Sequence, residues 1–151
     1  MTRILALVLA AFIPALTFAQ DASSTEAAPL IRPAGDSDLP EFLWVARPVV
    51  VFADSPNDPS FIEQMELLES GQEMLAVRDV VVLTDTDPSA RGPLRKKLRP
   101  RGFALVLIAK DGTVELRKPL PWTVRELTRS IDKMPDRQRE VEERRGPGLM
   151  Q

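Results

Sequence analysis

Two polar loops carry side chains that could bind a ligand or take part in chemistry. The first, residues 54–58 (DSPND), lies between the apolar run PVVVFA and Pro59, a residue that suits the first turn of a helix. Because the N–H groups that open a helix attract hydrogen-bond acceptors, this is a candidate ligand-binding loop. Its candidate residues are Asp54, Ser55, Asn57 and Asp58. The alternative interpretation is a plain turn in which Asp58 caps the helix.

The second loop, residues 84–89 (TDTDPS), follows the apolar run DVVVL. It resembles the nucleophile motif of haloacid-dehalogenase-type phosphatases, in which two carboxylates hold Mg²⁺ and attack phosphate. That family needs a further acidic pair much later in the chain, and none follows a buried strand here. A carboxylate- or metal-dependent enzyme therefore stays the alternative function. It would require four strand-end acids to converge: Asp54, Asp58, Asp85 and Asp87.

A basic run follows the second loop. Six basic residues lie within eleven positions: Arg91, Arg95, Lys96, Lys97, Arg99 and Arg101. They form either a solvated face or a patch for an anionic partner, which could be a protein or a small molecule. No aromatic side chain lies among them to stack on bases, so we expect no nucleic-acid partner.

The absent residue types exclude several functions. The chain of 151 residues contains no Cys and no His. Thiol redox activity and disulfides need a thiolate and are excluded, and the usual zinc ligands are missing. We expect no cofactor. The formal net charge of −2 gives no general attraction to nucleic acid or anionic membranes. A non-catalytic binding module with an unknown partner is the leading interpretation.

The N-terminus predicts export. Residues 1–19 are typical of a cleavable secretory signal: Arg3 supplies the positive start, residues 4–18 are almost wholly apolar, and small residues precede a cleavage site before Gln20. An uncleaved anchor is the alternative, but an apolar run of about 16 residues is short for a membrane span. We expect export to the periplasm, or else beyond the cell, with no membrane span after cleavage.

The elements that would position these loops form one α/β domain over residues 39–135, after a disordered linker at 20–38. Phe42 and Trp44 are expected to cover an edge of the domain. Four strands are predicted, at residues 48–53, 79–83, 103–109 and 113–118. The last two should be joined by a type I′ turn at Asp111-Gly112.

The helices are marked by their first residues. One begins at Pro59, capped by Asp58 or by a capping box of Ser60 with Glu63, and it is expected to kink or break at Gly71. A short basic helix spans 93–98. Thr123 and Glu126 predict a capping box, and the next four apolar positions predict its buried face: Val124, Leu127, Ile131 and Met134. Residues 136–151 are expected to form a charged, solvated helix and a frayed tail, with ion pairs Arg139/Glu143 and Glu140/Arg144.

This β-α-β-α-β-β-α order is that of the thioredoxin fold. Four stretches, FLWVARPVVVFA, RDVVVL, FALVLIAKDG and IDKMPDRQRE, resemble the domain-of-unknown-function family numbered 4174, over about residues 39–145. The resemblance implies a thioredoxin-like fold with a four-stranded mixed sheet and flanking helices, a distant likeness to peroxiredoxins, and an exported setting. Related domains occur in vertebrate extracellular-matrix proteins such as equarin. It implies no settled activity, and the loop at 54–58, where thioredoxin-like proteins carry reactive cysteines, has none.

Overall fold

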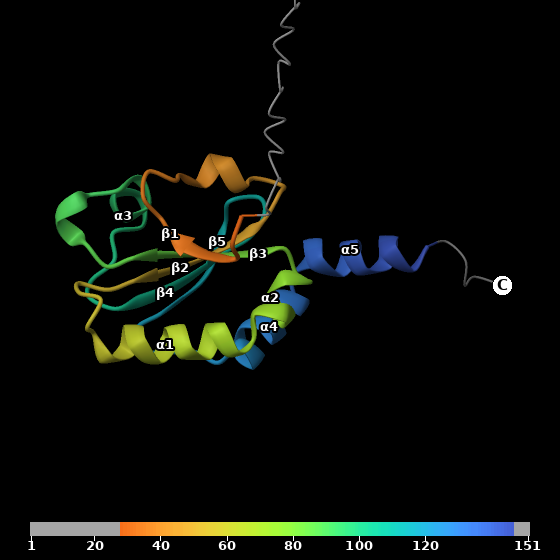
Figure 1. The fold of residues 1–151 in the computed structure, drawn as a ribbon. Helices are drawn as coiled ribbons and strands as arrows, with labels where there is room; N and C mark the ends of the chain where they lie inside the picture. The colour runs from red at the N-terminus through yellow and green to blue at the C-terminus, as the bar shows by residue number, and fades with distance from the viewer. Residues whose placement is uncertain (1–27, 147–151) are drawn as a thin grey trace, which may run out of the picture.

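The computed structural model describes residues 28–146, which form a five-stranded mixed sheet covered by helices on both faces (Figure 1). The strand order is β1-β3-β2-β4-β5. The strands are β1 (Ile31–Pro33), β2 (Arg47–Phe52), β3 (Val80–Asp85), β4 (Ala104–Ile108) and β5 (Val114–Lys118). The predicted signal, residues 1–19, lies outside the described residues.

The centre of the sheet is built from the β-branched runs. Every residue of β2 and β4 is buried, because helices cover both faces of these strands. β2 pairs with β3 in parallel and with β4 in antiparallel orientation, and β4 pairs with β5 as a hairpin. The predicted α/β class and the order of its four strands are confirmed.

The sheet has a fifth strand where the sequence predicted a disordered linker. β1 pairs in parallel with β3, Ile31 opposite Val82 and Pro33 opposite Thr84. Leu30 and Ile31 pack against the core, and this burial orders a segment with no periodic pattern. Proline lacks the N–H that a central strand must donate, so Pro33 is tolerated because β1 lies at the sheet edge.

Two layers of helix bury the two faces of the sheet (Figure 1). On one face lie α1 (Pro59–Ser70), α2 (Gln72–Ala76) and α4 (Val124–Asp132). The core there includes Leu68, Leu75, Leu127 and Ile131, all fully buried. On the other face lie α3 (Pro93–Leu98) and two short 3-10 turns, η1 (Leu39–Phe42) and η2 (Pro88–Ala90). α5 (Pro135–Arg145) extends away from the sheet.

The helix starts follow the predicted caps. The Asp58 carboxylate accepts a hydrogen bond from the Ser60 N–H at 2.8 Å, so Asp58 is the cap of α1 and Ser60 lies inside the helix. Thr123 and Glu126 form the predicted capping box of α4. The break at Gly71 is also confirmed, because Gly71 ends α1 and precedes α2.

The β4–β5 hairpin was predicted, but its turn type was wrong. A type I′ turn needs a positive φ at both central residues. Within residues 28–146, four non-glycine residues have a positive φ, and Asp111 is not among them. Of the two central residues of the turn, only Gly112 has a positive φ (+88°). The Gly112 N–H donates to the Ala109 carbonyl. The Asp111 carboxylate instead accepts from the Thr113 N–H, which favours this longer loop.

Phe42 and Trp44, in the segment before β2, were both expected to cover an edge of the domain, but only one of them is buried. Phe42 is buried in the core under α3, as expected. Trp44 is 70% exposed, so the prediction for Trp44 was wrong. Between residues 28 and 146, no helix is long and apolar enough to cross a bilayer.

Candidate functional site

The loop between β2 and α1, residues 54–58, is closed by its own hydrogen bonds. The Ser55 hydroxyl accepts from the Asn57 N–H at 3.1 Å, and Asp58 is occupied as the cap of α1. Of the four candidate residues, Asp54 and Asn57 have exposed side chains. The loop therefore has the geometry of a capped turn, which was the alternative interpretation of this segment.

Asp85 and Arg95 form the most enclosed ion pair at this end of the sheet. The Arg95 guanidinium donates to both Asp85 carboxylate oxygens, at 2.9 and 3.0 Å, and to the Ala53 carbonyl at 2.9 Å. The side chains of Arg95 and Asp85 are only 11% and 12% exposed. Arg95 also lies over the Phe52 ring, 5.4 Å from its centroid. Arg95 joins the ends of β2 and β3, so it is not part of an open basic surface.

The other strand-end acids are engaged separately. Asp87 caps η2 by accepting from the Ser89 N–H and hydroxyl, and these hydrogen bonds hold the pKa of Asp87 below its usual range. Asp54 faces Arg95 at 4.0 Å. In the described part of the chain, no three Asp or Glu residues are grouped so that they could hold a metal ion. The acids thus serve as caps and as partners of Arg95, which does not favour the phosphatase-like interpretation of TDTDPS.

The six residues of the predicted basic patch lie in different environments in the structure. Arg91 and Lys96 are exposed, and Lys97 is paired with Asp38 at 3.2 Å. Arg99 and Arg101 lie together on the loop between α3 and β4, apart from the enclosed Arg95. The six residues therefore do not form one surface, and Arg99 and Arg101 line a hollow.

That hollow, termed here the basic groove, has a volume of about 440 Å³. It lies where β4 begins and β5 ends, the same end of the sheet as the loop at 54–58. Four of its seven lining residues are cationic and three are apolar: Arg99, Arg101, Arg117 and Lys118, with Phe103, Ala104 and Pro119. The two cations of β5, Arg117 and Lys118, were not predicted from the sequence. The signal that could have found them is the hairpin register, which sets Lys118 opposite Leu105, next to the Arg101 loop.

Two of these cations are held in place by neutral groups. An Arg117 Nη donates to the Leu98 carbonyl at 2.7 Å, at the last turn of α3. The Lys118 ammonium lies 4.4 Å from the centroid of the Trp122 ring. The main chain of Trp122 is fixed in turn by the buried Gln64 side chain, which accepts from its N–H and donates to its carbonyl, both at 2.8 Å. The charges are therefore positioned without being neutralised.

No carboxylate of the described residues lies within 4.0 Å of the charged groups that line the basic groove, although the charge of Lys118 contributes, after the hydrogen bonds of Thr123, to the lowered pKa of Glu126. Among residues 28–146, every ion pair within 4.0 Å involves other cations than the four that line it. The charged ends of Arg117 and Lys118 lie toward opposite faces of the sheet, at the Leu98 carbonyl and at the Trp122 ring, so the cations flank the basic groove. Together they raise the local concentration of anions. The arrangement can bind an anion.

A second concentration of charge fixes α5 to the sheet. Arg47, at the start of β2, is fully buried and donates to Asp136 at 2.6 Å and to Glu140 at 3.0 Å. Glu140 also accepts from Lys110 at 2.7 Å and from Arg137 at 3.3 Å. The predicted pairing of Glu140 with Arg144 was therefore wrong, and ion pairs hold the first turns of α5, while seven of its eleven residues are exposed, as expected for a solvated helix.

The charges around Glu140 govern its ionisation. Burial disfavours the carboxylate, but the hydrogen bonds and charges of Lys110, Arg47 and Arg137 outweigh that effect and lower the pKa of Glu140 from 4.5 to about 2. Desolvation likewise opposes the charge of Lys110, and Asp79 and Glu140 overcome it and raise its pKa. The Nε atoms of Arg47 and Arg137 are buried without a hydrogen-bond partner among the described residues, but the ion pairs of this cluster link β2 to α5, which indicates a structural role.

Comparison with known proteins identifies a family and a fold. Residues 38–140 match the family model described as "Domain of unknown function (DUF4174)". No curated protein matches the chain. Among solved structures, Plasmodium yoelii Prx1a is similar, with 16% identity, a TM-score of 0.51, and coverage of 67% of this chain and 80% of that one. Reduced 2-Cys peroxiredoxin of Plasmodium vivax is similar too, with 15% identity, a TM-score of 0.51, and coverage of 69% and 84%. At such identity the likeness shows a thioredoxin-like fold and nothing of activity.

Proposed function

Because the chain belongs to the DUF4174 family, whose description names no activity, we propose a function from the site itself: an exported, non-catalytic module that binds a polyanionic partner in the basic groove. The observation that carries this proposal is the set of four cations around the groove, none of which has a carboxylate within 4.0 Å among residues 28–146. Folded proteins usually neutralise clustered charge, because like charges repel and destabilise the compact state. A cluster kept open at one end of the sheet is suited to an external anion.

Binding is favoured over catalysis by the chemistry of this end of the sheet. The sequence has no Cys, so the thiol reactions associated with this fold cannot occur. The acids that an alternative carboxylate enzyme would need are hydrogen-bonded in caps or paired with Arg95. An acid engaged in this way is a poor general base, since its lone pairs are occupied by hydrogen bonds.

The shape of the basic groove indicates the kind of anion. Its cations come from two chain segments, the α3–β4 loop and the end of β5, so a ligand with several negative charges can contact both. Phe103, Ala104 and Pro119 give the floor an apolar character that suits the carbon skeleton of such a ligand. An acidic protein segment and a sulfated or carboxylated glycan share this chemistry.

The proposed setting is outside the cytoplasm, in the periplasm or beyond the cell. It is supported by residues 1–19, whose single basic residue, apolar run and small-residue cleavage site are typical of a secretory signal.

Calorimetric titration tests this function. We would titrate the protein with a hexaglutamate peptide and with a heparin-derived hexasaccharide, at low and at raised ionic strength. Arg101→Glu should weaken binding by roughly tenfold or more, because it reverses a charge in the basic groove. The matched control is Lys96→Glu, the same charge reversal at an exposed residue outside the groove, which should change affinity less than about threefold.

Two results would contradict the proposal. One is that neither polyanion binds at low ionic strength. The other is that Lys96→Glu weakens binding as much as Arg101→Glu, since the effect would then follow net charge and not the basic groove. An unchanged melting temperature for both variants would show that folding is intact.

A further inference from the structure

An exposed tryptophan lines a small hollow at the opposite end of β2 from the basic groove. Trp44 lies in the loop that precedes β2 and is 70% exposed. The hollow, termed here the Trp44 hollow, has a volume of about 200 Å³. Its lining comes from that loop, from the turn after β4 and from α5: Trp44, Lys110, Asp136, Arg139, Glu140 and Glu143. It therefore combines one large aromatic ring with charged side chains of both signs.

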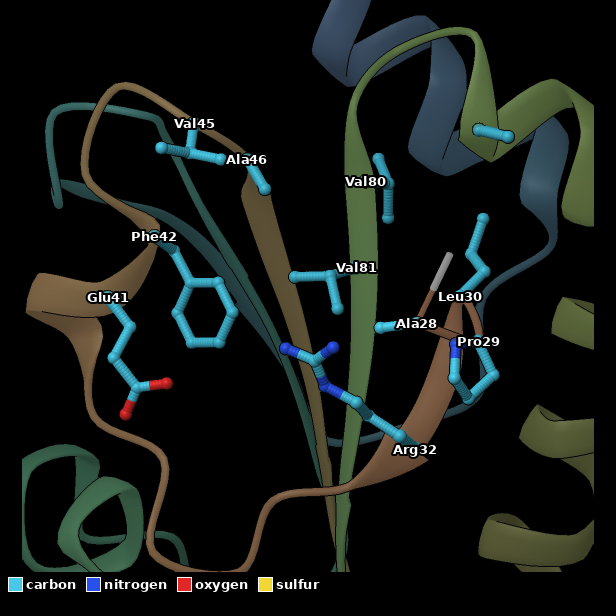
Figure 2. Close-up of a pocket in the computed structure, with 11 residues that line it drawn as sticks. Ala28, Pro29, Leu30, Arg32, Glu41, Phe42, Val45, Ala46, Val80 and Val81 are labelled. Carbon is cyan, nitrogen blue, oxygen red and sulfur yellow. The ribbon is translucent and has the colours of Figure 1, made fainter. Parts of the chain in front are cut away.

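The backbone holds Trp44 in its exposed position. The φ of Trp44 is +62°, a conformation that is unfavourable for a bulky side chain. The Trp44 N–H donates to the Lys110 carbonyl at 2.7 Å, and the Val45 N–H donates to the Phe42 carbonyl at 3.0 Å. Phe42 itself packs into the core and lines a separate hollow beside β3 (Figure 2). Strained residues that are fixed in this way cluster at binding sites.

The ring of Trp44 has a free face. Among the described residues, cations lie over the rings of Phe42, Phe52 and Trp122, and none lies over Trp44. The face of an indole carries partial negative charge, so it attracts cations and the weakly positive C–H groups of a ligand. A ligand can stack on Trp44 without displacing a side chain of the protein.

Only two of the charged groups in the Trp44 hollow are available to a ligand. Asp136, Glu140 and Lys110 belong to the ion pairs that fix α5 to the sheet. Arg139 and Glu143 are exposed, and the ion pair predicted between them is not formed. Among the described residues, neither has an opposite charge within 4.0 Å. The hollow thus offers one aromatic face, one guanidinium and one carboxylate.

A neutral pyranose sugar has matching chemistry. The C–H groups of its ring form an apolar face that can stack on an indole, and each of its hydroxyls both donates and accepts hydrogen bonds. Arg139 can donate to such hydroxyls, and Glu143 can accept from them. A simple cation would be repelled by Arg139 and a simple anion by Glu143, so the two charges together favour a neutral polar ligand.

We propose that the Trp44 hollow binds one pyranose ring of a neutral glycan, stacked on Trp44 and hydrogen-bonded to Arg139 and Glu143. Arg139 and Glu143 are four residues apart on α5, so their side chains leave the same face of the helix and can contact hydroxyls of one ring. The volume of about 200 Å³ is below the range of about 300–1,000 Å³ that is usual for drug-sized ligands, which suits a single ring.

This inference does not depend on the proposed function. The Trp44 hollow lies before the start of β2, and the basic groove lies at its end, where Phe52 pairs with Ala104. Binding of a polyanion weakens as ionic strength rises, because salt screens charges, whereas stacking of a neutral sugar is insensitive to salt. The two sites can therefore be tested, and can fail, separately.

An NMR titration of the purified protein tests the sugar site. The probes are cellohexaose and the hexamer of N-acetylglucosamine, two neutral glycans whose rings have apolar faces. The chain has two tryptophans, so the indole N–H signal of Trp122 is an internal control. The Trp44 indole signal should move on addition of glycan, at low and at raised ionic strength alike, and the Trp122 signal should not.

Three variants, followed on the amide signals of α5, locate the site. Trp44→Gly removes the indole and suits the positive φ, so it should fold normally and weaken binding by more than about tenfold. Glu143→Ala removes the available carboxylate and should weaken binding by about threefold or more. The matched control is Glu142→Ala, the same change at an exposed residue outside the hollow, which should alter affinity less than about twofold.

Three results would overturn the proposal. The first is that neither glycan moves the Trp44 indole signal. The second is that tetramethylammonium moves this signal and the glycans do not, because the ring would then serve as a cation site. The third is that the signal changes with protein concentration alone, because a second copy of the chain would then cover Trp44.

Discussion

The guanidinium of Arg47 is buried and has three hydrogen-bond partners. One of them, the Glu140 carboxylate, also pairs with Lys110 and Arg137. Arg47 reaches Asp136, Glu140 and the Arg78 carbonyl. Removing one partner of a buried pair leaves the other charge desolvated and uncompensated, which is more costly than losing an exposed pair. The free energy of this cluster therefore depends strongly on the ionisation of Glu140.

The first prediction concerns acid stability. The folded pKa of Glu140 is about 2 against an ordinary 4.5, so its contribution is fully present above pH 4.5 and is lost as the pH falls from 4.5 toward 2. Glu140→Gln should lower the free energy of unfolding at neutral pH by on the order of 3 kcal/mol. The difference between wild type and variant should shrink through that pH window, as measured by urea denaturation.

The control for this prediction lies on the same helix. Glu142 is exposed, and Glu142→Gln should change the free energy of unfolding by less than about 0.5 kcal/mol at any pH. A difference between wild type and Glu140→Gln that does not vary with pH would show that the Glu140 side chain acts through packing and not through its charge.

Individual site residues were harder to predict than the elements that carry them. Asp58 and Thr123 act as caps because their partners lie two and three residues away, and such local spacing is visible in a sequence. Arg95 was assigned to an open patch, but its partner Asp85 lies ten residues earlier on a neighbouring strand. Arg117 and Lys118 were missed because strand register, not sequence distance, brings them to Arg101.

At the scale of elements, the break between α1 and α2 has a physical cause that the sequence does not display. The helical penalty of glycine predicted a weak point at Gly71. The structure adds a close approach: a Cβ on Gly71 would lie 2.7 Å from the Val124 side chain of α4. Gly71 has a φ of −127°, so the requirement is space and not an unusual backbone conformation.

The second prediction follows from this contact. Gly71→Ala should destabilise the domain by about 1–3 kcal/mol, because Val124 is buried and β-branched and cannot easily move aside. Val124→Ala removes the obstructing methyl groups. The double variant should therefore be more stable than the sum of the single losses predicts, as a double-mutant cycle of denaturation midpoints would measure. Strict additivity would mean that α2 and α4 shift apart at no cost.

The elements with a strong local signal were predicted and those without one were not. The β-branched runs of β2, β3 and β4 and the capping box of α4 are local patterns, and each formed where expected. β1 has three residues and includes a proline, so only its pairing with β3 defines it. The charge of α5 suggested full solvation, because its partners Arg47 and Lys110 are distant in the sequence.

At the scale of the whole molecule, two of the segments that carried the family resemblance meet in space. FLWVARPVVVFA supplies Arg47, and IDKMPDRQRE supplies Asp136, Arg137 and Glu140, which surround it. This contact joins the start of the domain to its last helix. It also gives a structural reason for these stretches to occur together in one domain, within the matched residues 38–140.

The third prediction tests export. Protein recovered from the periplasm or the medium should begin at Gln20, within a residue or two, since the small residues before it suit signal cleavage. N-terminal sequencing or intact mass measures this directly. Recovery of exported protein with Met1 intact would contradict a cleavable signal and support the membrane-anchor alternative.

The measurement that tests the central claim most directly is a two-dimensional amide NMR titration with the hexaglutamate peptide and the heparin-derived hexasaccharide. If the basic groove binds polyanions, the largest shift changes should fall on Arg99, Arg101, Phe103, Arg117 and Lys118, and raised ionic strength should reverse them. Changes centred on residues 54–58, or on the exposed Arg91 and Lys96, would contradict the account. So would an unchanged spectrum at low ionic strength.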